Sequence, residues 1–144
     1  MNPVETLLAG ASEFGAVLTP HGFHFVETGS GRGSGGHFAS GEFRRADRRL
    51  ELHFRYSLGL VAYHLGSETL THADYVRAVR ASEGIPDRPR YPGFSEDPLD
   101  GFRHLRPDLI RFGRVFTQGS SAEFAALVAW VRQHPAPTGL AALR

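Results

Sequence analysis

The stretch from His37 to Leu65 constrains the fold most, because apolar and polar residues alternate along it with the two-residue period of β-strands. It reads HFASGEFRRADRRLELHFRYSLGLVAYHL. Two short segments, Arg45–Arg48 and Ser57–Leu60, interrupt this alternation and have the composition of hairpin connections. The stretch therefore predicts three consecutive antiparallel strands.

A first turn centred on Ala46 and Asp47 would place Phe43 opposite Leu50 and Gly41 opposite Leu52. Because successive side chains point to opposite faces, one face of this hairpin is then apolar. The other face pairs Arg44 with Arg49, Glu42 with Glu51, Ser40 with His53 and Phe38 with Arg55. We expect one buried face and one partly solvated face.

A second turn centred on Leu58 and Gly59 would place His53 directly opposite His64. It would also bring Glu51 close to this pair. Two imidazoles and a carboxylate can bind Zn²⁺, or supply an acid and a base. A solvated sheet face explains the same residues without chemistry, and no His-Glu-x-x-His motif accompanies them.

Helical periodicity flanks the strands on both sides. The first helix is predicted from Val4 to Leu18, and the residues after it, 22–28, read as a strand. After the strands, three signals predict helices: a capping box at Thr71–Asp74, an Asp97-Pro98 start whose helix should break or kink at Pro107, and a capping box at Ser120–Glu123. The irregular segment 85–94 separates the first two of these helices.

The run GSGRGSGG, residues 29–36, is predicted to be a mobile loop between strands. A phosphate-binding loop is not supported, because the run lacks both the Lys-Ser/Thr ending and the dinucleotide-binding glycine spacing before a helix.

Strands that cluster together, instead of alternating with helices, indicate an α+β fold rather than a doubly wound parallel sheet. We expect a single α+β domain over residues 1–144, with an N-terminal helix, an antiparallel sheet of about four strands, and three or four C-terminal helices on one face of the sheet. No window approaches 18 consecutive apolar residues, and residues 1–18 lack the features of a secretory signal. We therefore expect no membrane partner and a cytoplasmic location, which the absence of cysteine also fits.

Composition limits the chemistry. Sixteen basic residues stand against 15 acidic ones, and the net charge of +1 gives little long-range attraction for nucleic acids or anionic membranes. All 16 basic residues are arginine, which excludes Schiff-base chemistry on lysine, and the absence of cysteine excludes thiol catalysis. We expect no cofactor and no metal, and the sequence argues against an enzyme.

Two further surfaces could bind a partner. Arg44, Arg45, Arg48 and Arg49 cluster at the first hairpin, where they could contact phosphates. The acidic residues Glu42, Asp47 and Glu51 lie among them, which favours internal ion pairs over a nucleic-acid surface. In the loop 91–94, Tyr91 and Phe94 could anchor a partner or fix the loop to the core.

The segments LELHFRYSLGLVAYHLG, THADYV and YPGFSEDPLDGFRHLRPDL, in the order helix, sheet, helices, resemble those of small bacterial α+β proteins that include many immunity proteins of polymorphic toxin systems. The resemblance covers residues 15–118 and identifies no functional residue. It implies binding of another protein without catalysis.

Our hypothesis from the sequence is accordingly a non-catalytic, immunity-like protein-binding module. The predicted binding residues are Arg44, Arg55, His53, His64, Glu51, Tyr91 and Phe94. Three alternatives stay open. The first is a small metal-dependent or histidine-based hydrolase that uses His53, His64 and Glu51. The second is a protein that binds nucleic acid through the Arg44–Arg49 hairpin, and the third is a homo-oligomeric structural protein, such as a homodimer, joined along a sheet edge.

Overall fold

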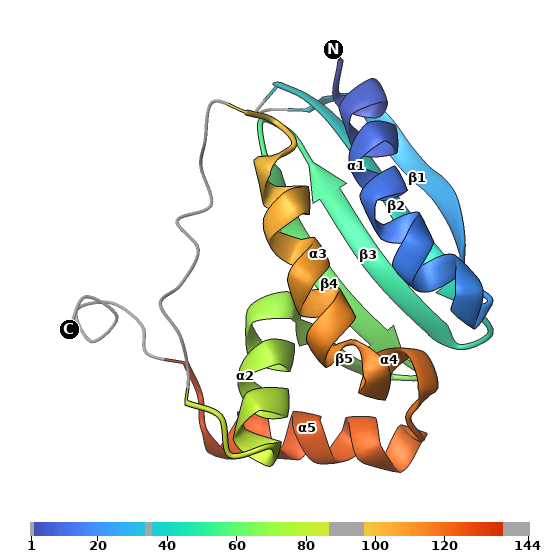
Figure 1. Ribbon diagram of the computed structural model, residues 1–144. Coiled ribbons are helices and arrows are strands. Elements are labelled where there is room, and N and C mark those ends of the chain that lie inside the picture. The colour runs from blue at the N-terminus through green and yellow to red at the C-terminus, as the bar shows by residue number, and fades with distance from the viewer. Residues whose placement is uncertain (1, 34–35, 87–96, 137–144) are drawn as a thin grey trace.

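The alternating stretch forms the centre of a five-stranded antiparallel sheet (Figure 1). The computed structural model describes residues 2–33, 36–86 and 97–136. In order, the elements are α1 (Pro3–Leu18), a 3-10 turn (Thr19–His21), β1 (His24–Gly33), β2 (Gly36–Arg45), β3 (Arg48–Phe54), β4 (Leu58–Leu65), β5 (Glu68–Thr71), α2 (His72–Ser82), α3 (Asp100–Phe112), α4 (Arg114–Gln118) and α5 (Ser121–Gln133). The predicted α+β class is confirmed, with one more strand than expected.

The strands lie in sequence order, β1-β2-β3-β4-β5, and each pairs with the next. The predicted register of the β2–β3 hairpin is confirmed over its whole length, with Phe43 opposite Leu50 and Ala39 opposite Phe54. Its two-residue turn is Ala46-Asp47, and Ala46 takes the left-handed conformation with φ 50°. Alternation on both sides of a tight turn therefore fixed this register.

The predicted register of the β3–β4 hairpin is wrong. Leu52 pairs with Val61 and His53 pairs with Leu60, so the connection runs through residues 55–57 and not through Leu58-Gly59. A bulge between His53 and Phe54 lets Phe54 pair with Leu58. The residue opposite His53 is Leu60, which precedes the predicted partner His64 by four residues. Because four is even, every side chain keeps the face that the alternation predicts.

The glycine-rich run is mostly paired strand and not a loop. Residues 29–33 continue β1, and their ladder with β2 reaches from Gly29, opposite Ser40, to Gly33, opposite Gly36. Backbone hydrogen bonds do not require side chains, so glycines with low strand propensity can still complete a ladder. The loop that we predicted here reduces to residues 34–35, which lie outside the described residues.

Two helices begin at the predicted caps. The Thr71 side chain accepts a hydrogen bond from the Asp74 backbone N–H at the start of α2. At the start of α5, Ser120 and Glu123 form a full capping box, in which each side chain accepts from the backbone N–H of the other residue.

The predicted break at Pro107 does not occur, because α3 runs through it from Asp100 to Phe112. Proline removes one backbone hydrogen bond within a helix. This cost is offset by the apolar stripe of α3, in which Phe102, Leu105 and Leu109 are buried.

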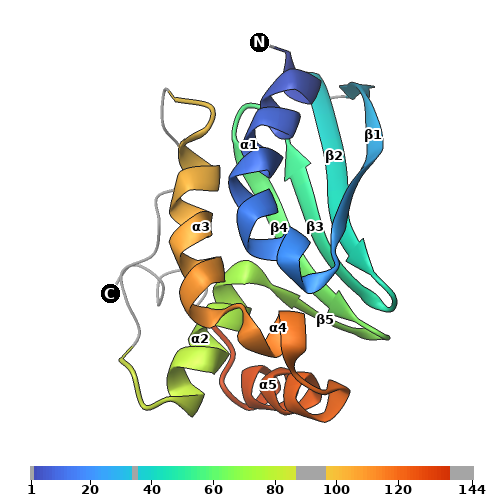
Figure 2. The same cartoon turned by 45° about the vertical axis from the view of Figure 1, so that its right-hand side comes forward.

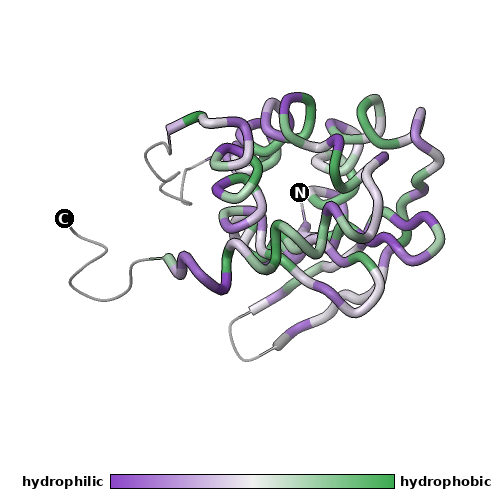
Figure 3. The backbone as a smooth tube through the Cα atoms, turned by 90° about the horizontal axis from the view of Figure 1, so that it is seen from below, coloured by the Kyte–Doolittle hydropathy of each residue, from purple (hydrophilic) through white to green (hydrophobic). Residues whose placement is uncertain are grey.

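The helices lie on one side of the sheet (Figures 1 and 2). α1, α2 and α3 lie over its face, and α4 and α5 close the end near β5. Apolar and polar segments alternate along both helices and strands (Figure 3), as expected for elements that bury a single face. The core between the two layers contains Leu7, Phe14, Phe43, Leu50, Leu52, Tyr63, Tyr75, Phe102, Phe116 and Phe124. The opposite face of the sheet is not covered by any described helix.

Candidate functional site: the open face of the sheet

The open face is the side of the sheet opposite the helices, and the strand pleat places alternate residues on it. Its three central strands contribute Phe38, Ser40, Glu42 and Arg44 from β2, Arg49, Glu51 and His53 from β3, and Leu60, Ala62 and His64 from β4. The outer strands add His24 and Val26 from β1 and Thr69 and Thr71 from β5. Arg55 follows β3 and lies beside Phe38. Five of the seven predicted binding residues therefore lie on or next to this face.

Glu42 is the buried centre of a charge cluster on the open face. Its side chain is only 5% exposed, and it accepts hydrogen bonds from Arg44 and Arg49, the latter at 2.9 Å. Burial alone raises the pKa of Glu42, but the hydrogen bonds and positive charges of the two arginines outweigh it and hold the pKa below its ordinary value. Glu42 is thus a carboxylate already occupied by internal partners.

Glu51 and His64 form a second pair. His64 Nε2 lies 2.8 Å from the Glu51 carboxylate, and its Nδ1 lies 2.9 Å from the Thr69 hydroxyl. The strands β3, β4 and β5 are thereby linked across the open face. The predicted proximity of Glu51 to His64 is confirmed.

His53 does not belong to this pair. His64 lies opposite Arg49, four residues along β3 from His53, which corresponds to about 13 Å of strand. The reason is the shifted β3–β4 register. His53, His64 and Glu51, which we considered for a hydrolytic or zinc site, therefore do not converge, and no group of three or more His, Cys, Asp or Glu within the described residues could hold a metal ion.

His53 instead belongs to an aromatic cluster at the other end of the face. Its ring stacks on Phe38 with centroids 5.5 Å apart, and the Arg55 guanidinium lies 5.9 Å from the centre of the Phe38 ring. Leu60, opposite His53, is 43% exposed. This end of the face combines exposed apolar surface with positive charge.

The arginines of the first hairpin are bound internally. Arg45 donates to the backbone carbonyl of His21 at 2.7 Å, and Arg48 donates to those of Phe116 and Gly119. These bonds hold the helical layer against the sheet. The expectation of internal contacts, rather than a free arginine cluster, is confirmed for this hairpin.

Tyr91 and Phe94, the two predicted binding residues of the loop 91–94, lie outside the described residues.

Three polar side chains that the sequence did not indicate form a chain of hydrogen bonds beneath the helices. The Tyr63 hydroxyl lies 2.8 Å from His72 Nδ1, and His72 Nε2 lies 2.9 Å from the Asp108 carboxylate. Because the three residues come from β4, α2 and α3, no local spacing could have revealed them. The order acid, histidine, hydroxyl is that of a catalytic triad.

The position of Tyr63 argues against catalysis. Its side chain is fully buried, at 0% exposed, and it stacks on Tyr75 with centroids 4.2 Å apart. Burial also raises the pKa of Tyr63 well above its ordinary value, so the phenol keeps its proton. A nucleophile must reach its substrate, so we interpret this chain as a structural link between the two layers.

No family model, curated protein or solved structure matches this chain. Its function must therefore be argued from its own residues. No helix among the described residues has the length and apolar character needed to cross a membrane.

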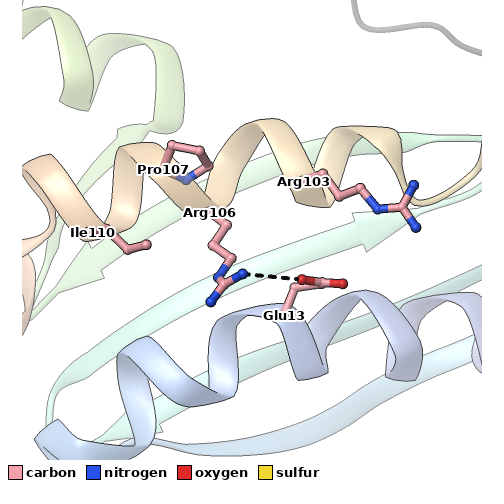
Figure 4. Close-up of a pocket in the computed structure, with 5 residues that line it drawn as sticks. All are labelled: Glu13, Arg103, Arg106, Pro107 and Ile110. Carbon is pink, nitrogen blue, oxygen red and sulfur yellow. Dashed lines mark ion pairs between the residues drawn. The ribbon is translucent and has the colours of Figure 1, made fainter.

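A groove on the helical side carries no comparable chemistry. It lies between α1 and α3, encloses about 300 Å³, and is lined by Glu13, Arg103, Arg106, Pro107 and Ile110 (Figure 4). Arg106 and Glu13 face each other across it, 3.9 Å apart. Arg103, the other charged residue of the lining, pairs with Asp97. All three charged residues of the groove thus have internal partners, and the open face of the sheet is the better candidate site.

Proposed function

We propose that this protein is a non-catalytic binding module that docks an acidic surface of another protein on the open face of its sheet. The resemblance to immunity proteins implies only the binding of another protein without catalysis. One observation carries the proposal. The helices cover a single face of the sheet, and the two carboxylates on the other face are both occupied by cationic or imidazole partners from the chain itself.

The charge that remains on this face is positive. Three arginines (Arg44, Arg49, Arg55) stand against two glutamates (Glu42, Glu51), an excess of 3 − 2 = 1 before any histidine is protonated. An acidic partner surface complements such a face and is steered to it on approach. A basic partner would find no carboxylate available without breaking an internal pair.

Apolar anchors accompany this charge at one end. Phe38 and Leu60 lie on the open face, and the adjacent Tyr56 is 69% exposed. Protein interfaces combine a central aromatic or aliphatic anchor with a charged rim, and tyrosine and arginine are enriched in them. This mixture favours a protein over a nucleic acid, because a phosphate backbone requires several unpaired cations in a row.

The area of the face is sufficient. The strands β1 to β5 have 10, 10, 7, 8 and 4 residues. At about 3.3 Å per residue and about 4.8 Å between strands, they project onto roughly 600 Å². Side-chain relief makes the accessible area larger, so the face approaches the ~800 Å² that each partner buries in a standard interface.

The proposal is tested by capture and mapping. Tagged protein is used to capture partners from lysate of the native host, in parallel with the double variant Arg44→Glu/Arg55→Glu and the control Arg132→Glu. Arg132 lies on α5 with its side chain 74% exposed, so it undergoes the same charge reversal away from the open face. Leu60→Asp, which adds a negative charge to the apolar end of the face, tests the same surface without changing an arginine. Circular dichroism checks that each variant is folded.

We expect one protein with an acidic surface to be captured in stoichiometric amount by the wild type and by Arg132→Glu, and to be lost with the other two variants. With the purified pair, hydrogen exchange should show protection on β2, β3 and β4, and the association rate should fall as salt is added. Protection elsewhere, or equal loss with Arg132→Glu, would contradict the proposal. Capture of no protein, a self-associated dimer in light scattering, or near-equimolar zinc in the purified protein would overturn it in favour of the alternatives.

A further inference from the structure

A second cavity lies at the end of the sheet opposite the β2–β3 turn, on the helical side. It encloses about 530 Å³. Its walls come from the start of α1, the end of β1, the start of β2, the end of β3 and the β3–β4 connection, together with one residue that precedes α3. The lining residues are Pro3, Thr6, Arg32, Gly36, His37, Phe54, Arg55, Tyr56 and Pro98. Segments far apart in the sequence therefore build one cavity within the volume range of small-molecule sites.

Two arginines give the lining its positive charge. Among the described residues, the lining includes Arg32, Arg55 and His37, and no described carboxylate belongs to it. Neither arginine forms an ion pair with a described carboxylate, and the Arg55 guanidinium contacts the Phe38 ring. A bound anion would supply the counter-charge that no described carboxylate gives to these two arginines.

Asp97, the sequence neighbour of the lining residue Pro98, contacts other groups. Its carboxylate accepts from the backbone N–H of Leu99 and pairs with Arg103, so it is directed to the start of α3 and does not line the cavity. These contacts also hold the pKa of Asp97 below its ordinary value. Asp97 therefore does not supply a counter-charge for the two arginines of the cavity.

The remaining lining residues indicate which kind of organic group could carry the anion. Tyr56 offers a phenolic hydroxyl, and its position against the hairpin depends on Gly36, where an added Cβ would lie 2.5 Å from that hydroxyl. Pro3, Phe54 and Pro98 provide apolar walls. Guanidinium groups bind planar or tetrahedral oxyanions by paired hydrogen bonds, and apolar walls accept a small ring or chain.

We infer that this cavity binds a small organic molecule through a carboxylate or phosphate group held by Arg32 and Arg55. The cavity overlaps the proposed docking face at Arg55 and Tyr56. Arg32 lines the cavity and is not part of the docking face, so an Arg32 variant distinguishes the two sites.

The test uses three probes that share one ring: phenyl phosphate, benzoate and the neutral benzamide. Each is titrated into the full chain, and binding is followed by calorimetry and by the amide NMR signals of Thr6, Gly36 and Tyr56. We expect at least one anion to bind with a dissociation constant near or below about 1 mM, the range of a single charge-assisted site, and benzamide to bind far more weakly. The tighter anion identifies the oxyanion that the site prefers.

The variants Arg32→Gln and Arg55→Gln should each weaken the anion by roughly tenfold or more, because each removes a charged donor. Arg132→Gln, the matched loss of charge on α5, should leave the affinity unchanged. Tyr56→Phe removes only the hydroxyl of an exposed side chain, so this variant should fold even if an arginine variant does not. It should weaken anion binding by a few-fold, because one hydrogen-bond donor is lost. The inference is overturned if benzamide binds as well as the anions, if no anion shifts the three amides, or if Arg32→Gln and Tyr56→Phe both retain wild-type affinity.

Discussion

The buried carboxylate of Glu42 offers the sharpest test of the structure. In Glu42→Gln, the shape is kept and the charge that faces Arg44 and Arg49 is removed. A hydrogen bond to a charged group contributes about 1.5–3 kcal/mol when its partners are buried, whereas an exposed ion pair contributes about 0.2–1 kcal/mol.

The expected magnitude lies between these limits, because the Glu42 side chain is 5% exposed while both arginine side chains are 44% exposed. We expect Glu42→Gln to lower the free energy of unfolding at pH 7 by about 1–3 kcal/mol, after discounting for the solvent around the guanidiniums. For a chain of this length this is a decrease in Tm of roughly 3–10 °C. The matched control is Glu51→Gln on the neighbouring strand, where the side chain is 37% exposed. It should cost less than about 0.5 kcal/mol.

The lowered pKa of Glu42 determines how the stability of the fold should change with pH. The pKa of Glu42 is lower in the folded than in the unfolded chain, so its charge stabilises the fold fully above the unfolded value near 4.5. That contribution is lost as the pH falls from 4.5 through the folded pKa. Urea unfolding of wild type and Glu42→Gln should therefore differ most at pH 7 and converge in acid. Equal costs for the two glutamine variants, or a difference that does not shrink in acid, would refute this reasoning.

Two further predictions concern the helices. Gly10→Ala should destabilise the protein by about 1–3 kcal/mol in chemical denaturation, because the new methyl group would overlap the buried Phe102 ring. Gly15→Ala in the same helix meets nothing closer than 3.8 Å and should stabilise by up to about 1 kcal/mol, so a similar loss in both would contradict the α1–α3 packing. Ser120→Ala should cost about 1 kcal/mol by removing the cap of α5, while the adjacent Ser121→Ala should cost little, and the two are compared by thermal unfolding.

The β2–β3 hairpin shows what the sequence could predict. Alternation on both strands fixes the buried face, and the two-residue Ala46-Asp47 turn fixes the register. Capping residues did the same for α2 and α5, since a cap acts within three residues of the helix start.

The β3–β4 hairpin shows why the rest could not be predicted. Alternation distinguishes the two faces, but it does not distinguish registers that differ by an even number of residues. The glycine in Leu58-Gly59 favoured a turn there, yet Leu58 begins β4 and packs against the core. A Cβ on Gly101 of α3 would lie 3.0 Å from Leu58, so this contact between distant segments, which no local pattern contains, favours the observed register.

β5 and the buried Asp108–His72–Tyr63 chain were missed for related reasons. Glu68–Thr71 is four residues long with a single buried side chain, Leu70, which is too short for alternation to be detected. His72 and Asp108 are 36 residues apart and meet only through the packing of α2 on α3. Local rules predict elements, whereas side-chain networks depend on how the elements are packed.

The arginines show how far a charge pattern alone can be interpreted. In the sequence the densest arginine cluster is Arg44–Arg49, yet all four of its guanidiniums bind Glu42 or backbone carbonyls, so the cluster holds the fold together. Arg32 and Arg55 are isolated in the sequence, yet the meander brings them to one cavity at the opposite end of the sheet, where no described carboxylate neutralises them. A small anion is bound best by a cation without an internal partner, because breaking an existing ion pair offsets the gain from a new one. The experiments on the anion site are therefore directed at Arg32 and Arg55 and not at the arginine-rich hairpin.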